Sequence, residues 1–169
     1  MDFQQIINKI EETRTELLVI LANMNGNDLY KQKDLESWSI SQVCQHLYIT
    51  EELYVVAIRK GLKSKEDSFI ANKPVERLLD RRNKLEAPEI AKPSNEVLEY
   101  QVIIENLNNS RQKLHELLST IEDSSVLSRR YFVHPVFKEM LLIEWLESLY
   151  IHEQRHIQQI KEIIDERKG

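Results

Sequence analysis

The sequence predicts an all-α protein, a four-helix bundle, on the basis of three observations. Of its 169 residues only 3 are glycine and 4 are proline, while 30% are charged. Over most of the chain, hydrophobic residues recur every three or four positions, the spacing that gives a helix one apolar face. Four such segments are long enough to bury an apolar stripe, and four amphipathic helices pack together as a bundle. The length suits a single domain, residues 1–169.

The first two helices are recognised by the residues at their ends. An apolar stripe runs through residues 2–24, and the Asn-Gly-Asn-Asp sequence that follows is typical of a helix C-terminus and turn. Ser39, with Gln42 three residues later, has the pattern of a capping box, so a second helix begins at Ser39. We expect Gly61 to end it. His46 lies at the edge of its inward face, which is formed by Ile40, Val43, Leu47, Tyr54 and Ile58.

The connection between the second and third helices determines the topology. Residues 62–95 are irregular and hold three of the prolines; a short helix over about residues 74–85, capped by Asn72, is expected there. Antiparallel neighbours need only about 2 to 8 residues between them. The far longer segment found here predicts a crossover, so that the second and third helices run parallel in an up-down-down-up arrangement.

The remaining two helices follow from the same periodicity. The third is expected over about residues 94–121, with Arg111 interrupting its stripe and His115 at the surface. Residues 124–138 are expected to form a loop, and the fourth helix covers residues 140–164 before a polar tail. The inward residues expected on the third helix are Val97, Ile104, Leu107, Leu114, Leu118 and Ile121.

Composition and charge argue against several classes of partner. A net charge of -5 does not suit nucleic-acid binding, which needs a concentrated basic face. No apolar run approaches the roughly 20 residues that span a bilayer, and Met1 leads into an amphipathic helix instead of a signal peptide. We therefore expect a cytoplasmic protein without a membrane partner. Cys44 is the single cysteine, which excludes an internal disulfide, and we expect it to serve packing.

Two histidines of the fourth helix occupy positions where its apolar stripe calls for a hydrophobic residue. His152 and His156 are four residues apart, so their rings lie on one face about 6 Å apart along the axis. Two imidazoles at this spacing can share one metal ion. They could instead be core residues with separate hydrogen-bond partners, although burying two polar rings side by side is then unfavourable.

The same residues match the H-E-x-x-H motif of zinc metalloproteases, with Glu153 in the place of the glutamate that activates water. That architecture takes a third ligand from beyond the motif, where only the end of the same helix remains here. The sequence therefore does not favour a protease. A third ligand would have to come from upstream, and His46 is the one other histidine predicted to face the interior. Three histidines leave coordination positions open, as catalytic metal sites do.

Several short motifs, in order from the second helix to the end, resemble those of the DinB/YfiT-like superfamily. They are Trp38-Ser39, Gln45-His46-Leu47, His134-Pro135-x-Phe137, Glu144-Trp145 and His152-Glu153-x-Arg155-His156-x-x-Gln159-Ile160. One departure is Lys138, which stands where a glycine often follows the H-P-x-F element.

This resemblance implies an up-down-down-up bundle that holds nickel, zinc or iron through His46, His152 and His156. It also implies a homodimer, and a low-molecular-weight thiol as cofactor, as in bacillithiol-dependent S-transferases and mycothiol-dependent maleylpyruvate isomerase. We therefore expect thiol S-transferase or hydrolase chemistry on a small-molecule substrate, with Glu153, Glu51 and Tyr54 as candidates for proton transfer. Two alternatives remain: a bundle that binds metal without catalysis, as a structural or sensing module, and an interaction module whose histidines belong to the core.

Overall fold

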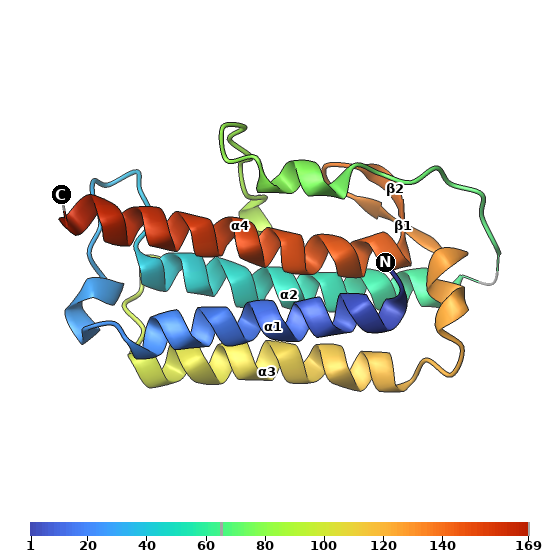
Figure 1. Ribbon diagram of the computed structural model, residues 1–169, viewed down its shortest axis with the longest axis horizontal. Coiled ribbons are helices and arrows are strands. Elements are labelled where there is room, and N and C mark those ends of the chain that lie inside the picture. Colours follow the sequence, from blue (N-terminus) through green and yellow to red (C-terminus); the bar gives the residue numbers. More distant parts are fainter. Residues whose placement is uncertain (65, 169) are drawn as a thin grey trace.

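The computed structural model describes residues 1–64 and 66–168. Its main elements are four long helices. They are α1 (Phe3–Ala22), α2 (Ile40–Lys63), α3 (Tyr100–Ser119) and α4 (Leu142–Lys168). Figure 1 shows that α1 and α4 run in one direction along the bundle and that α2 and α3 run in the other. The predicted up-down-down-up four-helix bundle, with its long crossover between α2 and α3, is therefore confirmed. Among the helices described, none is both long and apolar enough to cross a bilayer.

The N-terminus of α2 is built as predicted, but its C-terminus is not. The hydroxyl of Ser39 accepts from the backbone N–H of Gln42 at 3.1 Å, and the side-chain oxygen of Gln42 accepts from the N–H of Ser39 at 2.9 Å. Gly61 does not end the helix, which continues to Lys63. A Cβ at this position would lie 2.5 Å from Cδ2 of Leu142. The glycine is therefore needed for the close approach of α2 to the start of α4.

The crossover between α2 and α3 is mostly irregular and lies along α4 (Figure 1). In place of the expected helix over residues 74–85 it forms a 3₁₀ helix at Val75–Leu79, which Pro74 precedes without a side-chain cap from Asn72. A second, shorter one follows at Glu89–Ala91. The third helix begins at Tyr100, later than predicted, and Val97 is 71% exposed instead of inward-facing. Arg155 of α4 holds the crossover in place by donating to three carbonyl oxygens, those of Leu78, Asp80 and Asn83.

A β-hairpin precedes α4 where a loop was predicted. After a 3₁₀ helix at Ser124–Ser128, strands β1 (Tyr131–His134) and β2 (Lys138–Leu141) pair antiparallel, with Phe132 opposite Met140. Lys138 has a φ of 62°, the left-handed region that favours glycine. Lys138 therefore adopts a backbone conformation at this turn that glycine adopts more easily. Residues 165–168, expected as a polar tail, continue α4.

The hydrophobic core consists of two clusters of buried side chains. One is built around Ile10, Tyr54, Leu114 and Leu149, and the other around Leu17, Leu47, Leu107 and Ile157. Cys44 belongs to the second cluster, where burial raises the pKa of its thiol to about 12. This burial agrees with the packing role predicted for it.

Candidate metal centre

The structure brings together the three histidines that the sequence singled out. His46 of α2 meets His152 and His156 of α4, although His46 and His152 are 106 positions apart in the chain. The Nε2 atom of His152 lies 3.1 Å from Nε2 of His46 and 3.1 Å from Nε2 of His156. In the described parts of the chain, no other group of three or more His, Cys, Asp or Glu side chains brings its ligand atoms within 4.8 Å of one another.

Hydrogen bonds on the far side of two rings fix their tautomers. Nδ1 of His46 lies 2.8 Å from the carbonyl oxygen of Ala91, and Nδ1 of His156 lies 2.7 Å from the side-chain oxygen of Gln159. Because these oxygens can only accept, both Nδ1 atoms carry the proton. In the neutral rings, the Nε2 atoms of His46 and His156 therefore present lone pairs toward His152.

This arrangement suits a cation better than it suits the histidines alone. Nε2 of neutral His152 carries at most one proton, so it can donate to only one of the two lone pairs that face it. A metal ion accepts all three lone pairs at once. Bonds of about 2.1 Å at tetrahedral or octahedral angles place ligand nitrogens about 3.0 to 3.4 Å apart. The observed separations of 3.1 Å fit this range.

Burial keeps all three imidazoles neutral, which is the form that binds a metal. It lowers the pKa of His156 to about 3, with His46 nearby adding to the effect. Burial also lowers the pKa of His46, against a smaller opposing effect of its bond to Ala91, and lowers that of His152 well below the usual value. His46 and His156 are 4% and 8% exposed, whereas His152 is half-buried.

The candidate general bases are already engaged in other contacts. Glu51 is 1% and Glu153 is 2% exposed, and each forms ion pairs with Arg14 and with Arg111. Glu153 therefore does not stand free beside the metal site as the glutamate of the protease motif would. Sequence reasoning missed this cluster, although Arg111 in an apolar stripe was a visible sign of it.

Tyr54, the third candidate for proton transfer, is held by a histidine of the hairpin. Nδ1 of His134 accepts from the backbone N–H groups of Val136 and Phe137 at 3.1 and 3.3 Å, so its proton is on Nε2. Nε2 then donates to the Tyr54 hydroxyl at 3.0 Å. Burial raises the pKa of Tyr54 to about 12 and lowers that of His134 to about 4, so both groups are neutral near pH 7. The pair fixes the hairpin to α2.

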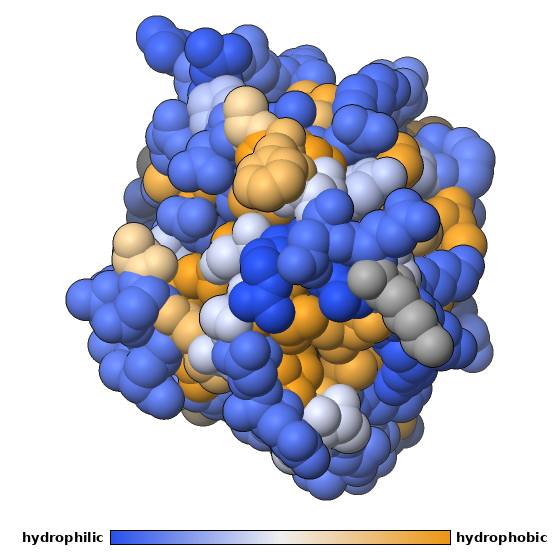
Figure 2. Space-filling view, turned by 90° about the vertical axis from the view of Figure 1, so that its right-hand side faces the viewer, coloured by the Kyte–Doolittle hydropathy of each residue, from blue (hydrophilic) through white to orange (hydrophobic). Residues whose placement is uncertain are grey.

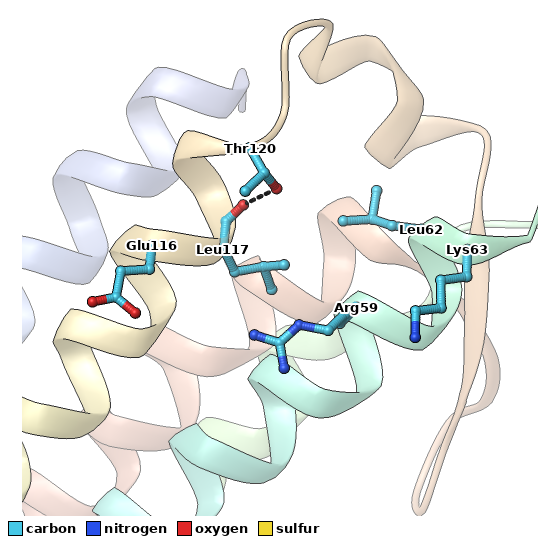
Figure 3. A pocket seen from close by; sticks show the side chains of 6 residues that line it. All are labelled: Arg59, Leu62, Lys63, Glu116, Leu117 and Thr120. Carbon is cyan, nitrogen blue, oxygen red and sulfur yellow. Dashed lines mark hydrogen bonds between the residues drawn. The ribbon is translucent and has the colours of Figure 1, made fainter.

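A surface pocket of about 360 Å³ lies away from the histidines, between the C-terminal ends of α2 and α3. Figure 3 shows that Leu62 of α2 and Leu117 of α3 point toward each other across this pocket. Figure 2, which views this end of the bundle, likewise shows apolar side chains at the surface between hydrophilic ones. At 1.5 Å per residue, Gly61 lies about 22 Å along α2 from His46, so the pocket is not part of the metal centre. Its lining residues are Arg59, Leu62, Lys63, Glu116, Leu117 and Thr120.

Comparison with known proteins places the chain in a family. The uncharacterized protein YuaE of Bacillus subtilis is 28% identical over 152 residues, which cover 90% of this chain and 93% of YuaE. The four-helix bundle protein TT2238 superposes with a TM-score of 0.64 at 18% identity, covering 95% of this chain and 98% of that one. YfiT from Bacillus subtilis, described as a probable metal-dependent hydrolase with an unusual four-helix bundle topology, gives 0.67 at 18% identity, covering 98% and 87%. The model of the DinB superfamily matches residues 9–160, and the chain belongs to this superfamily.

Proposed function

We propose that this protein is a divalent-metal-dependent enzyme that attaches a thiol, or water, to an electrophilic small molecule. The observation that carries the proposal is the convergence of three neutral imidazoles, in which the lone pairs of His46 and His156 both face His152, although His152 can donate to only one of them. A divalent ion bound there supplies Lewis acidity, which makes a water or a thiol nucleophilic near neutral pH. Three protein ligands leave room for the nucleophile.

The chain's own residues hold this site in place. The Ala91 carbonyl and the Gln159 side chain orient His46 and His156 through their Nδ1 protons, and such outer contacts commonly strengthen metal binding. The crossover is in turn fixed to α4 by Arg155, the residue before His156. The site is therefore supported by the crossover in addition to the helices that bear the ligands.

The state of the carboxylates favours a thiol over water as the nucleophile. Glu51 and Glu153 are paired with arginines, so neither is free to accept a proton. A thiol, with a pKa of about 8.5, needs far less help to ionise than water does. In the proposed transfer the thiol proton passes to solvent, sulfur bonds to an electrophilic carbon, and the leaving group departs with its bonding electrons. Hydrolysis remains the second reaction because YfiT, of the same fold, is described as a probable metal-dependent hydrolase.

Metal analysis tests the premise that both reactions share. The protein is purified without chelator and its nickel, zinc and iron content is measured. We expect about one equivalent of a divalent metal, lost in His152→Ala and retained in His115→Ala, whose imidazole is exposed on α3. A metal-free wild-type protein that stays metal-free after incubation with each ion would contradict the proposal.

Turnover then separates the reactions. The metal-loaded protein is given cysteine with 1-chloro-2,4-dinitrobenzene, and separately a panel of nitrophenyl esters. Loss of thiol with release of chloride identifies an S-transferase, and ester cleavage without thiol identifies a hydrolase. If wider panels of both kinds stay silent with the metal bound, the alternative of a non-catalytic metal-binding bundle replaces the proposal. A homodimer stays a prediction, which light scattering on the purified protein tests.

A further inference from the structure

Four charged side chains, one from each helix, form a buried cluster in the middle of the bundle. They are Arg14 of α1, Glu51 of α2, Arg111 of α3 and Glu153 of α4, with exposed fractions between 1% and 6%. On every helix the cluster residue lies between the two hydrophobic clusters of the core, as Arg14 does between Ile10 and Leu17. A polar layer thus divides an otherwise apolar interior.

Each carboxylate of the cluster contacts both guanidinium groups. Glu153 accepts from Nε of Arg14 at 2.6 Å and from Nη2 of Arg111 at 3.2 Å. Glu51 accepts from Nη2 of Arg14 at 3.2 Å, from Nε of Arg111 at 3.0 Å and from the Ser110 hydroxyl at 2.6 Å. The arginines also donate to the backbone carbonyls of Leu107 and Ile10. The charges of these four residues balance, and every one of them is directionally bonded. Arg111 also pairs with Glu11, a partly exposed carboxylate at the edge of the cluster, at 3.4 Å.

The cluster adjoins the metal ligands on both helices that bear them. Glu153 directly follows His152, and Glu51 comes five residues, about 7.5 Å, after His46. A shift of α4 by one residue would rotate its side chains by about 100° and break both ion pairs of Glu153. Apolar packing alone tolerates such rearrangements better than paired buried charges do. The charges therefore restrict how α2 and α4 can be rotated about their axes.

We propose that this four-residue cluster positions the metal centre, and that Glu153 and Glu51 are positioning residues. By fixing the rotation of α2 and α4, the cluster directs His46, His152 and His156 toward one point. The inference rests on the proposed function, because it assigns to these residues a role in metal binding. It differs from a purely structural role in one measurable way: changing the cluster alters the affinity and coordination of the metal, as well as the stability of the fold.

The test replaces Glu153 with Asp, which keeps the charge but withdraws the carboxylate by one methylene. The zinc dissociation constant is measured by competition with a chromophoric chelator, and the visible absorption of the cobalt(II)-loaded protein reports the coordination geometry. We expect roughly tenfold weaker zinc binding, as for other groups that orient metal ligands, and an altered cobalt spectrum. Leu114→Ala is the matched control, since Leu114 is fully buried on α3 one turn from Arg111 and bears no charge. It lowers the thermal midpoint but leaves zinc affinity and the cobalt spectrum unchanged.

The outcomes separate this inference from the proposed function. If wild-type protein binds no metal, both fail together. If the wild type binds zinc and Glu153→Asp binds it as tightly as Leu114→Ala does, with the same cobalt spectrum, only the positioning role is overturned. Should Glu153→Asp fail to fold by circular dichroism, Ser110→Ala decides: it removes one hydrogen bond to Glu51 and leaves the charges paired. We expect weaker zinc binding in this variant, and an unchanged affinity would reject the inference.

Discussion

Two groups of polar side chains lie inside the same bundle, and they differ in whether their members satisfy one another. The ion-pair cluster of Arg14, Glu51, Arg111 and Glu153 has balanced charges and complementary donors and acceptors. The three histidines instead direct at least two lone pairs toward one another. A cluster whose donors and acceptors match needs no ligand to be stable, whereas lone pairs that face one another are stabilised when a cation binds between them.

The largest loss of stability is expected from removing one member of the ion-pair cluster. Arg14→Met leaves the carboxylate of Glu153 short of its nearest partner in a buried layer. We expect the free energy of unfolding to fall by about 3 to 5 kcal/mol, measured with urea on metal-free protein. Lys9→Met, on the exposed face of the same helix, is the control and changes it by less than about 1 kcal/mol. A loss below 1 kcal/mol in Arg14→Met would show that the cluster is not a structural unit.

The pH dependence of stability tests the burial of His134, which belongs neither to the ion-pair cluster nor to the three-histidine site. The folded His134 has a pKa of about 4, below the usual value near 6.5 in the unfolded chain. Between these values the unfolded state binds more protons, so stability is complete above about pH 6.5 and is lost as the pH falls toward 4. This histidine accounts for about 3 kcal/mol of that loss. His134→Asn should flatten the stability curve over this window; a curve parallel to that of the wild type would contradict the assignment.

Adding a divalent metal ion tests the three-histidine site. A divalent metal at 100 times its dissociation constant should raise the free energy of unfolding by about 2.7 kcal/mol, an effect that chelator reverses. We expect no such gain in His46→Ala, and the full gain in His115→Ala. Differential scanning calorimetry with and without metal measures this. If metal stabilised His46→Ala as much as the wild type, the metal would bind at a site that does not include His46.

The smallest effect is expected from removing one of the three histidines when no metal is present. His152→Leu takes away the ring that the two lone pairs face, while His46 and His156 keep their outer hydrogen bonds. We expect the stability of the metal-free protein to change by less than about 1 kcal/mol, or to increase. Urea unfolding in the presence of chelator measures it. A large loss would mean that the histidines stabilise the core on their own, as the interaction-module alternative requires.

Much of the fold could be predicted from local patterns. The apolar stripes located the four helices, the Ser39–Gln42 pattern located the start of α2, and the length of the crossover predicted the parallel helices. The stripe of α4 also placed His152 and His156 on the inner face. These features depend on residues near one another in sequence, so periodicity and spacing report them directly.

The features that were missed depend on contacts between distant segments. Gly61 looked like a helix end because its packing partner, Leu142, comes 81 positions later and has no local signature. Glu153 was a candidate for proton transfer, and only the fold shows that two arginines meet it. The support of His46 comes from a backbone carbonyl, that of Ala91, which every residue type offers. Spacing rules contain no information about such partners.

The contact between the carbonyl of Ala91 and His46 is a consequence of the parallel arrangement of α2 and α3. Because α3 starts at the end of the bundle where α2 started, the chain must return along the whole bundle (Figure 1), and on the way the carbonyl of Ala91 accepts from His46. A plain up-down bundle with short loops would leave that side open to water. The crossover, which such a bundle lacks, therefore supplies the contact that orients one of the three ligands.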